Sequence, residues 1–189
     1  VIRVGDKYYM VASDFHYIGI QVLESADMVN WKIVSQVYDR FDMPGWDANN
    51  HYGGGSWAPS IRWHDGRFWV FFCTPDDGLF MSTATDARGP WSPLHCVEKV
   101  ERWEDPCPLW DDDGQAYLFW GNRECYYVKL KENMIETDGD IHQVAIDASH
   151  PFTEAPWVHK YNGKYYLTYA SEWPEKIAYA MADKVTGPY

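Results

Sequence analysis

The sequence predicts an all-β protein of the β-propeller class. Aromatic residues make up 17% of its 189 residues, and they occur in short runs bounded by Gly, Pro, Asn and Asp, as is typical of β-strands and their turns. A hairpin pattern built from such runs recurs along the chain, with turns near residues 6, 66, 114 and 163. A spacing of roughly 50–60 residues suits a propeller blade of four strands.

The first repeat lies at the start of the sequence. A hairpin is predicted over residues 1–10 around Gly5-Asp6, and residues 20–25 and 27–31 supply the second half of the repeat. By analogy with the later repeats, the residue that opens its first strand is expected upstream of Val1.

The second repeat is the most regular. Residues 57–72 are predicted to form two aromatic strands around Asp65-Gly66, and residues 79–84 and 86–91 follow as the second half. The polar, glycine-rich segment 39–56 leads into the position that opens this blade. We therefore expect this insertion to rim the central pocket.

The third repeat spans residues 105–120 with a turn at Asp113-Gly114, followed by residues 125–130 and 141–146. A shorter insertion, residues 95–104, precedes it and is also expected at the rim.

The fourth repeat carries the strongest hairpin signal. Strands are predicted near residues 154–160 and 164–170 on either side of Asn162-Gly163, the dipeptide that best tolerates the two positive φ angles of a type I′ turn. Residues 177–182 and 183–189 form its second half.

Three residues open a strand nine positions before the turn glycine, and a proline follows each: Trp57, Asp105 and Glu154. Because blades stack around an axis, equivalent positions point at one central funnel. Two carboxylates on different strands are the minimum apparatus for glycoside hydrolysis, and an aromatic face stacks on a sugar ring. The structural alternatives are that Asp105 caps its strand, that Glu154 is a solvated loop carboxylate and that Trp57 packs between blades.

Composition excludes several classes of function. A net charge of −12 disfavours nucleic-acid binding, which needs a basic surface, and fits a neutral carbohydrate better. The sequence has no apolar run of about 18 residues that would span a membrane. Its four cysteines lack a Cys-x-x-Cys pair, so no zinc site is predicted, and Cys73 and Cys107 are expected to be small buried hydrophobic residues. Gly53-Gly54-Gly55 precedes a strand and lacks the Gly-Lys-Ser/Thr ending of a phosphate loop.

Four segments in combination resemble glycoside hydrolase family 43. They are Trp57-Ala58-Pro59, Glu104-Asp105-Pro106, Asp111-Asp112-Asp113-Gly114-Gln115-Ala116-Tyr117-Leu118, and Thr153-Glu154-Ala155-Pro156 followed by Asn162-Gly163-Lys164-Tyr165-Tyr166-Leu167. The resemblance implies a five-bladed propeller, of which about three and a half to four blades lie in this chain, as one partial catalytic domain over residues 1–189. The family includes α-L-arabinofuranosidases, β-D-xylosidases and arabinan-cleaving enzymes.

The resemblance also implies an inverting hydrolase acting on terminal arabinofuranosyl or xylosyl units of plant-type poly- or oligosaccharides. Glu154 would be the general acid, and Asp105 would tune the pKa of that acid and orient the substrate. Trp57 would line the pocket at the terminal sugar. Phe15 and His16 match a segment that borders the same pocket, although an ordinary hydrogen-bonded loop histidine explains His16 equally well.

Two parts of the family pattern are not found in the sequence. The general base, an aspartate in an Asp-Pro segment, is expected upstream of Val1, and the last blade is absent. The 189 residues alone are therefore expected to be inactive or impaired. No cofactor is assigned, and a structural calcium ion in the full-length family fold is left open, as are secretion and association through exposed blade edges.

The rival from another class is a non-catalytic carbohydrate-binding propeller that uses the same aromatic funnel. A propeller hydrolase acting on fructosides is a weaker rival, because the Trp-Ala-Pro and Glu-Ala-Pro segments match family 43 better.

Overall fold

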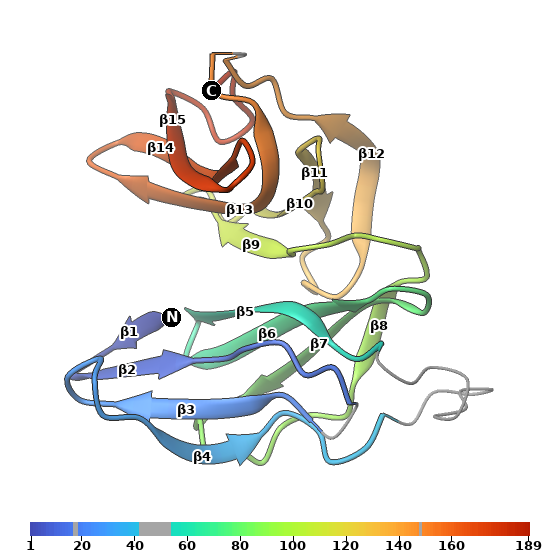
Figure 1. Cartoon of the computed structure of the whole chain (residues 1–189). Coiled ribbons are helices and arrows are strands. Elements are labelled where there is room, and N and C mark those ends of the chain that lie inside the picture. The colour runs from blue at the N-terminus through green and yellow to red at the C-terminus, as the bar shows by residue number, and fades with distance from the viewer. Residues whose placement is uncertain (17–18, 42–53, 148) are drawn as a thin grey trace. The chain divides into compact units, whose positions relative to one another are not determined.

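The computed structural model describes residues 1–16, 19–41, 54–147 and 149–189. These residues form fifteen strands in four antiparallel sheets and contain no helix (Figure 1). Within these ranges no helix is long and apolar enough to cross a membrane. The chain divides into two compact units, Val1–Arg102 and Trp103–Tyr189, and each is described by itself.

Unit 1 (Val1–Arg102) contains two four-stranded sheets, ordered β1-β2-β3-β4 and β5-β6-β7-β8. The first consists of β1 (Ile2–Val4), β2 (Lys7–Met10), β3 (Gln21–Ser25) and β4 (Lys32–Gln36). The second consists of β5 (Trp57–His64), β6 (Arg67–Thr74), β7 (Gly78–Ala84) and β8 (His95–Glu98). Most of the predicted insertion 39–56, namely residues 42–53, lies outside the described residues.

Unit 2 (Trp103–Tyr189) contains a four-stranded sheet, ordered β12-β11-β10-β9, and a three-stranded sheet, ordered β13-β14-β15. The first consists of β9 (Cys107–Trp110), β10 (Ala116–Trp120), β11 (Tyr126–Leu130) and β12 (Thr137–Gln143). The second consists of β13 (Phe152–Tyr161), β14 (Lys164–Ser171) and β15 (Lys176–Ala182). The all-β propeller architecture is therefore confirmed. The outer strands β4 and β8 lie beyond the predicted repeat ranges, and β8 falls in the segment 95–104 that was expected to be an insertion.

Two of the three predicted Asx-Gly turns adopt a positive φ at both residues, whereas at Asp113-Gly114 only the glycine does. Asn162 and Gly163 have φ angles of 48° and 76°, and Asp65 and Gly66 have φ angles of 47° and 71°. Two successive positive φ angles are the signature of a type I′ turn, whose twist matches that of the flanking strands. The turns thus set the register of β5 against β6 and of β13 against β14.

A positive-φ residue followed by proline, which we call the proline bulge, recurs at or near the start of β5, β9 and β13, and it corrects the register expected from the sequence. Ala58, Asp105 and Ala155 have φ angles of 38°, 58° and 58°, and a proline follows each. Asp105 is therefore equivalent to these alanines, and Glu104 is equivalent to Trp57 and Glu154. Counting back from the turn glycine misplaces the third repeat by one position. In that repeat Gly114 lies eight positions after Pro106, whereas in the second and fourth repeats the glycine lies seven positions after the proline.

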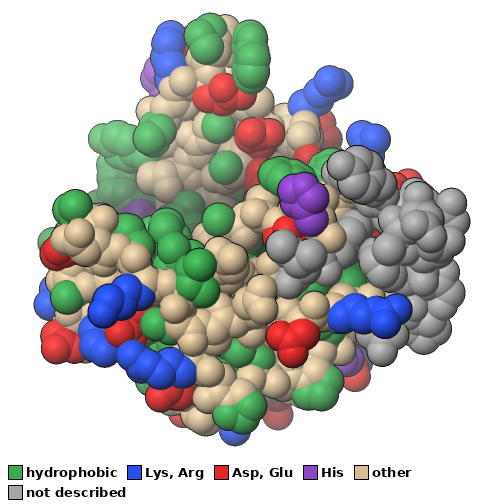
Figure 2. All heavy atoms as spheres, turned by 60° about the horizontal axis from the view of Figure 1, so that its bottom comes forward, with side chains coloured by type: hydrophobic (Ala, Val, Ile, Leu, Met, Phe, Trp, Pro, Cys, Tyr) green, Lys and Arg blue, Asp and Glu red, His purple; other side chains and the backbone are tan. Residues whose placement is uncertain are grey.

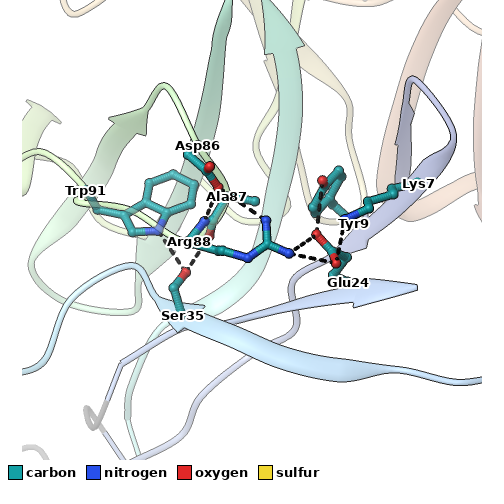
Figure 3. A network of polar contacts seen from close by, with 8 residues as sticks. All are labelled: Lys7, Tyr9, Glu24, Ser35, Asp86, Ala87, Arg88 and Trp91. Carbon is teal, nitrogen blue, oxygen red and sulfur yellow. Dashed lines mark hydrogen bonds and ion pairs between the residues drawn. The ribbon is translucent and has the colours of Figure 1, made fainter. Parts of the chain in front are cut away.

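A Gly-Pro-aromatic segment ties the second sheet of each unit to the first. In unit 1, Trp91 Nε1 donates to Ser35 Oγ at 3.0 Å, and Ser35 Oγ donates to the Ala87 carbonyl at 2.6 Å (Figure 3). In unit 2, Tyr189 N donates to the Ala145 carbonyl at 2.8 Å.

A carboxylate adds a second tie in unit 1. Glu24 on β3 accepts Lys7 Nζ at 3.0 Å, the Tyr9 hydroxyl at 3.2 Å and Arg88 Nη2 at 2.9 Å on both oxygens (Figure 3). Because Arg88 follows β7, this network joins the two sheets of unit 1.

Each unit has its own apolar core. In unit 1, Ile20, Val22, Phe41, Val70, Phe72 and Phe80 are fully buried, and in unit 2, Phe119 and Leu167 are fully buried. Cys73 and Cys107 are also buried, which confirms the prediction for both cysteines.

Candidate active site

The openings of β9 and β13 bring the two predicted carboxylates of unit 2 together. Ala155 N donates to Asp105 Oδ2 at 2.7 Å, although the two residues are 50 positions apart in the sequence. Since Ala155 directly follows Glu154, the Asp105 carboxylate is anchored to the backbone that carries Glu154. Both side chains are partly buried.

The surroundings of Asp105 disfavour its ionised form. Burial raises the pKa of Asp105 to about 6, from an ordinary value of 3.8. The hydrogen bond from Ala155 opposes this rise in pKa, whereas the negative charges of Glu154 and Glu104 add to it. A carboxyl group that is pushed towards neutrality by burial and a like-charged neighbour is typical of catalytic sites.

The segment that follows β10 closes against both strand openings. Gly121 N donates to the Glu104 carbonyl at 3.0 Å, and Arg123 N donates to the Thr153 carbonyl at 2.6 Å. Asn122 forms an isolated antiparallel bridge with Glu154, and its Nδ2 donates to Glu104 Oε2 at 2.7 Å. Sequence reasoning identified neither Asn122 nor Glu104 as a site residue, although the proline bulge would have placed Glu104 at the site register.

In unit 1, the predicted aromatic residues lie together. The rings of Phe15 and Trp57 are 6.5 Å apart, edge to face at 62°, and Trp57 Nε1 donates to the Gly54 carbonyl at 2.9 Å. Phe15 is 49% exposed, so its ring is open to solvent beside a partly buried tryptophan.

The backbone around this aromatic pair is fixed by a two-way bridge. Asp14 N donates to the Ser56 carbonyl at 3.0 Å, and Ser56 N donates to the Asp14 carbonyl at 2.7 Å. Gly55 has a φ of +92°, and a Cβ atom there would lie 2.0 Å from the Asp14 carbonyl oxygen. Only glycine therefore permits the close approach that places Phe15 beside Trp57.

His16 lies at the edge of this group. Its backbone N donates to Asp14 Oδ1 at 3.1 Å, and its Nδ1 lies 3.8 Å from the same oxygen. The His16 side chain is 67% exposed. The structure thus gives His16 a local carboxylate neighbour on the same loop.

Charged side chains of both signs lie at the surface of the protein (Figure 2). On the face drawn in Figure 2, basic side chains lie among acidic and apolar ones. Across the part of the chain that the structure describes, no group of three or more His, Cys, Asp or Glu side chains is arranged to hold a metal ion.

Comparisons with known proteins give one consistent result. The family model described as "Glycosyl hydrolases family 43" matches residues 1–189. A "Putative beta-xylosidase" from Xylanibacter ruminicola is 70% identical over 118 residues, which are 62% of this chain and 23% of the relative. A "Non-reducing end alpha-L-arabinofuranosidase BoGH43B" from Bacteroides ovatus is 37% identical over 97 residues, which are 49% of this chain and 18% of that protein.

The same similarity appears among solved structures. The structure described as "Bifunctional GH43-CE Bacteroides eggerthii" superposes with a TM-score of 0.86 and 31% identity, covering 100% of this chain and 26% of that one. The chain thus spans about a quarter of the length of these longer relatives.

Proposed function

Because the chain belongs to glycosyl hydrolase family 43, we propose that the protein removes terminal α-L-arabinofuranosyl or β-D-xylosyl units from plant-type poly- or oligosaccharides. The observation that carries the proposal is the hydrogen bond from Ala155 N to Asp105 Oδ2 at 2.7 Å, which anchors a second carboxylate beside Glu154. The xylosidase and arabinofuranosidase descriptions of the relatives support the choice of sugar.

Glu154 is the proposed general acid. It protonates the glycosidic oxygen as the bond to the sugar breaks, while a water molecule attacks the anomeric carbon from the opposite face, so that the configuration inverts. The base that activates this water is expected upstream of Val1, in keeping with the motif resemblance.

Asp105 has two proposed roles beside that acid. Two neighbouring carboxylates disfavour ionisation of both at once, which favours a state in which one proton stays available for donation. Because Asp105 Oδ2 accepts the hydrogen bond from Ala155 N, the other carboxylate oxygen of Asp105 is proposed to accept a hydrogen bond from a sugar hydroxyl.

Trp57 and Phe15 are proposed to bind the terminal sugar. An aromatic ring offers an apolar face to the C–H groups of a sugar ring, and a pocket of this kind needs few polar groups to fix orientation. Phe15, at 49% exposure, retains free ring surface for such a contact.

The test is hydrolysis of an aryl α-L-arabinofuranoside and an aryl β-D-xyloside. Rates are compared for the 189-residue chain, for a chain extended upstream, and for Glu154→Gln in the extended chain. The matched control is Glu136→Gln, which removes an exposed carboxylate paired with Lys131 at 2.6 Å. We expect Glu154→Gln to lower kcat by roughly 10²–10⁴-fold and the control to leave it unchanged.

Several outcomes decide the proposal. Proton NMR of the released sugar should show the inverted anomer first. A Glu154→Gln chain that keeps more than half of the wild-type rate would remove Glu154 as the acid. An extended chain that is inactive on both glycosides but binds xylo- or arabino-oligosaccharides in calorimetry would favour the non-catalytic binding propeller.

A further inference from the structure

Glu104 occupies a position that the other repeats use for site residues. The residue two places before the bulge proline is Trp57 in β5 and Glu154 in β13, and the positive φ angles of Ala58, Asp105 and Ala155 put Glu104 in the same register. Because the proline bulge fixes the local backbone in the same way at each opening, the side chain before it is presented in a comparable manner.

The side chain and the backbone of Glu104 both hold the segment after β10. Asn122 Nδ2 donates to Glu104 Oε2 at 2.7 Å, and Gly121 N donates to the Glu104 carbonyl at 3.0 Å. A hydrogen bond to an ionised carboxylate is stronger than one between neutral groups. Gly121 has a φ of +154°, and a Cβ there would lie 1.9 Å from the Glu124 carbonyl oxygen, so the segment has one tightly specified path.

That path ends on the strand that carries Glu154. Arg123 N donates to the Thr153 carbonyl at 2.6 Å, and Asn122 pairs with Glu154 in an isolated bridge. Asn122 therefore contacts Glu104 through its side chain and Glu154 through its backbone. The β9 opening is thereby connected to the residue proposed as the acid by a route separate from the Asp105–Ala155 hydrogen bond.

We propose that Glu104 is a positioning residue for Glu154, acting through Asn122 to hold the opening of β13 in the geometry needed for proton donation. This inference rests on the proposed function, because it assigns Glu154 the role of general acid. Glu104 has a second effect on the site, since its charge and that of Glu154 are the two negative charges that raise the pKa of Asp105.

Three variants of the upstream-extended chain separate these effects: Asn122→Ala, Glu104→Ala and Glu104→Gln. Asn133→Ala is the matched control, since Asn133 Oδ1 accepts a local bond from Ile135 N at 3.1 Å in the turn between β11 and β12. For each variant, kcat and KM on the aryl glycosides are measured across pH, well below its unfolding temperature.

The expected pattern follows from what each variant keeps. Asn122→Ala should lower kcat about fivefold to tenfold, the worth of one hydrogen bond, with KM within twofold and the acidic limb of the pH profile in place. Glu104→Ala should lower kcat at least as much. It also removes one of the two charges that raise the pKa of Asp105, so the acidic limb should move to lower pH. Glu104→Gln keeps an acceptor, so it should recover part of that kcat while the acidic limb stays displaced.

Other results would overturn the inference. If Asn122→Ala and Glu104→Ala match the Asn133→Ala control in kcat, Glu104 does not position the acid. If either variant raises KM with kcat unchanged, Glu104 contacts the substrate instead. If the wild-type extended chain hydrolyses neither glycoside, the proposed function fails and this inference fails with it, a result distinct from an active enzyme with indifferent variants.

Discussion

Replacing Asp105 by asparagine should stabilise the protein at neutral pH while it impairs hydrolysis. Burial holds the pKa of Asp105 at about 6 in the folded protein, against 3.8 for an ordinary aspartate. Between these two values the folded protein binds more protons than the unfolded chain, so the free energy of unfolding falls as pH rises through this window. Above about pH 6 the ionised carboxylate opposes folding by its full amount.

The size of the effect follows from the shift in pKa. A difference of about two pH units corresponds to at most about 3 kcal/mol at neutral pH. Asparagine removes the buried charge but keeps a carbonyl oxygen that can accept the bond from Ala155 N. We therefore expect Asp105→Asn to raise the free energy of unfolding by up to about 3 kcal/mol at pH 7.5 and by almost nothing at pH 3.5.

Urea unfolding of the 189-residue chain at pH 3.5, 5.0, 6.0 and 7.5 measures this directly. Asp111→Asn is a control of opposite sign. Burial alone would raise the pKa of Asp111, but hydrogen bonds from Tyr165 and Lys160 outweigh it and hold the pKa below its usual range. The bonds measure 2.5 Å from the Tyr165 hydroxyl and 2.9 Å from Lys160 Nζ. Asp111→Asn should therefore destabilise the protein at pH 7.5, and the loss should disappear as pH falls through that lowered pKa.

The two variants refute the reasoning if they behave alike. A loss of stability in Asp105→Asn at pH 7.5 would mean that the bond from Ala155 outweighs burial. A gain of the same size at pH 3.5 and 7.5 would mean that the effect does not come from ionisation. A residue whose removal stabilises the fold but impairs activity is retained for function, so the expected pattern also bears on the proposed role of Asp105.

Two further predictions concern unit 1. Glu24→Gln should lower the free energy of unfolding by about 2 kcal/mol at pH 7. Burial would raise the pKa of Glu24, but bonds from Lys7 and Arg88 hold that pKa below its usual range, so the loss of stability should vanish in acid. A loss that does not depend on pH in urea unfolding would contradict this. Gly55→Ala places a Cβ 2.0 Å from the Asp14 carbonyl oxygen and should therefore separate Phe15 from Trp57. Calorimetry should then show at least tenfold weaker binding of xylo-oligosaccharides. Unchanged binding would mean that the aromatic pair is not part of the sugar site.

The hairpins could be predicted from the sequence because their information is local. Asn162-Gly163 and Asp65-Gly66 both adopt two positive φ angles, a property that few other dipeptides share. The strands on either side follow from aromatic and β-branched runs, and the predicted ranges 154–160 and 164–170 lie inside β13 and β14. Turn chemistry and strand composition agree here, so the local sequence is sufficient to predict this hairpin.

The outer strands were harder to predict because they depend on their neighbours. The third repeat was expected to end with a strand at 141–146, whereas β12 runs from Thr137 to Gln143. Its Asp138-Gly139-Asp140 segment has the composition of a turn, and Gly139 has a φ of +85°. The pairing of β11 with β12 is irregular between Tyr127 and Lys129, so this glycine lies in a bulge that only the partner strand reveals.

The part of the candidate site that lies at equivalent positions of the repeats could be predicted from the sequence. Asp105 and Glu154 were identified, and the structure joins them through Ala155. Glu104 was overlooked because one extra residue in the β9–β10 connection shifted the register that was counted from the glycine. Asn122 had no sequence signal, since its bond to Glu104 spans 18 residues and depends on the path of the segment after β10.

The proline bulge explains how one fold presents different chemistry at successive openings. A residue before proline normally avoids positive φ, yet Ala58, Asp105 and Ala155 all adopt it, at a cost of roughly 1–3 kcal/mol each. Proline cannot join the strand ladder, so the backbone turns at this point whichever side chain precedes the bulge. The preceding position can therefore carry an aromatic residue in β5 and a glutamate before β9 and in β13. Strain that recurs at three openings, next to the residues proposed to bind and protonate the substrate, is better explained by the site than by folding, because an unstrained strand start would serve the sheets equally well.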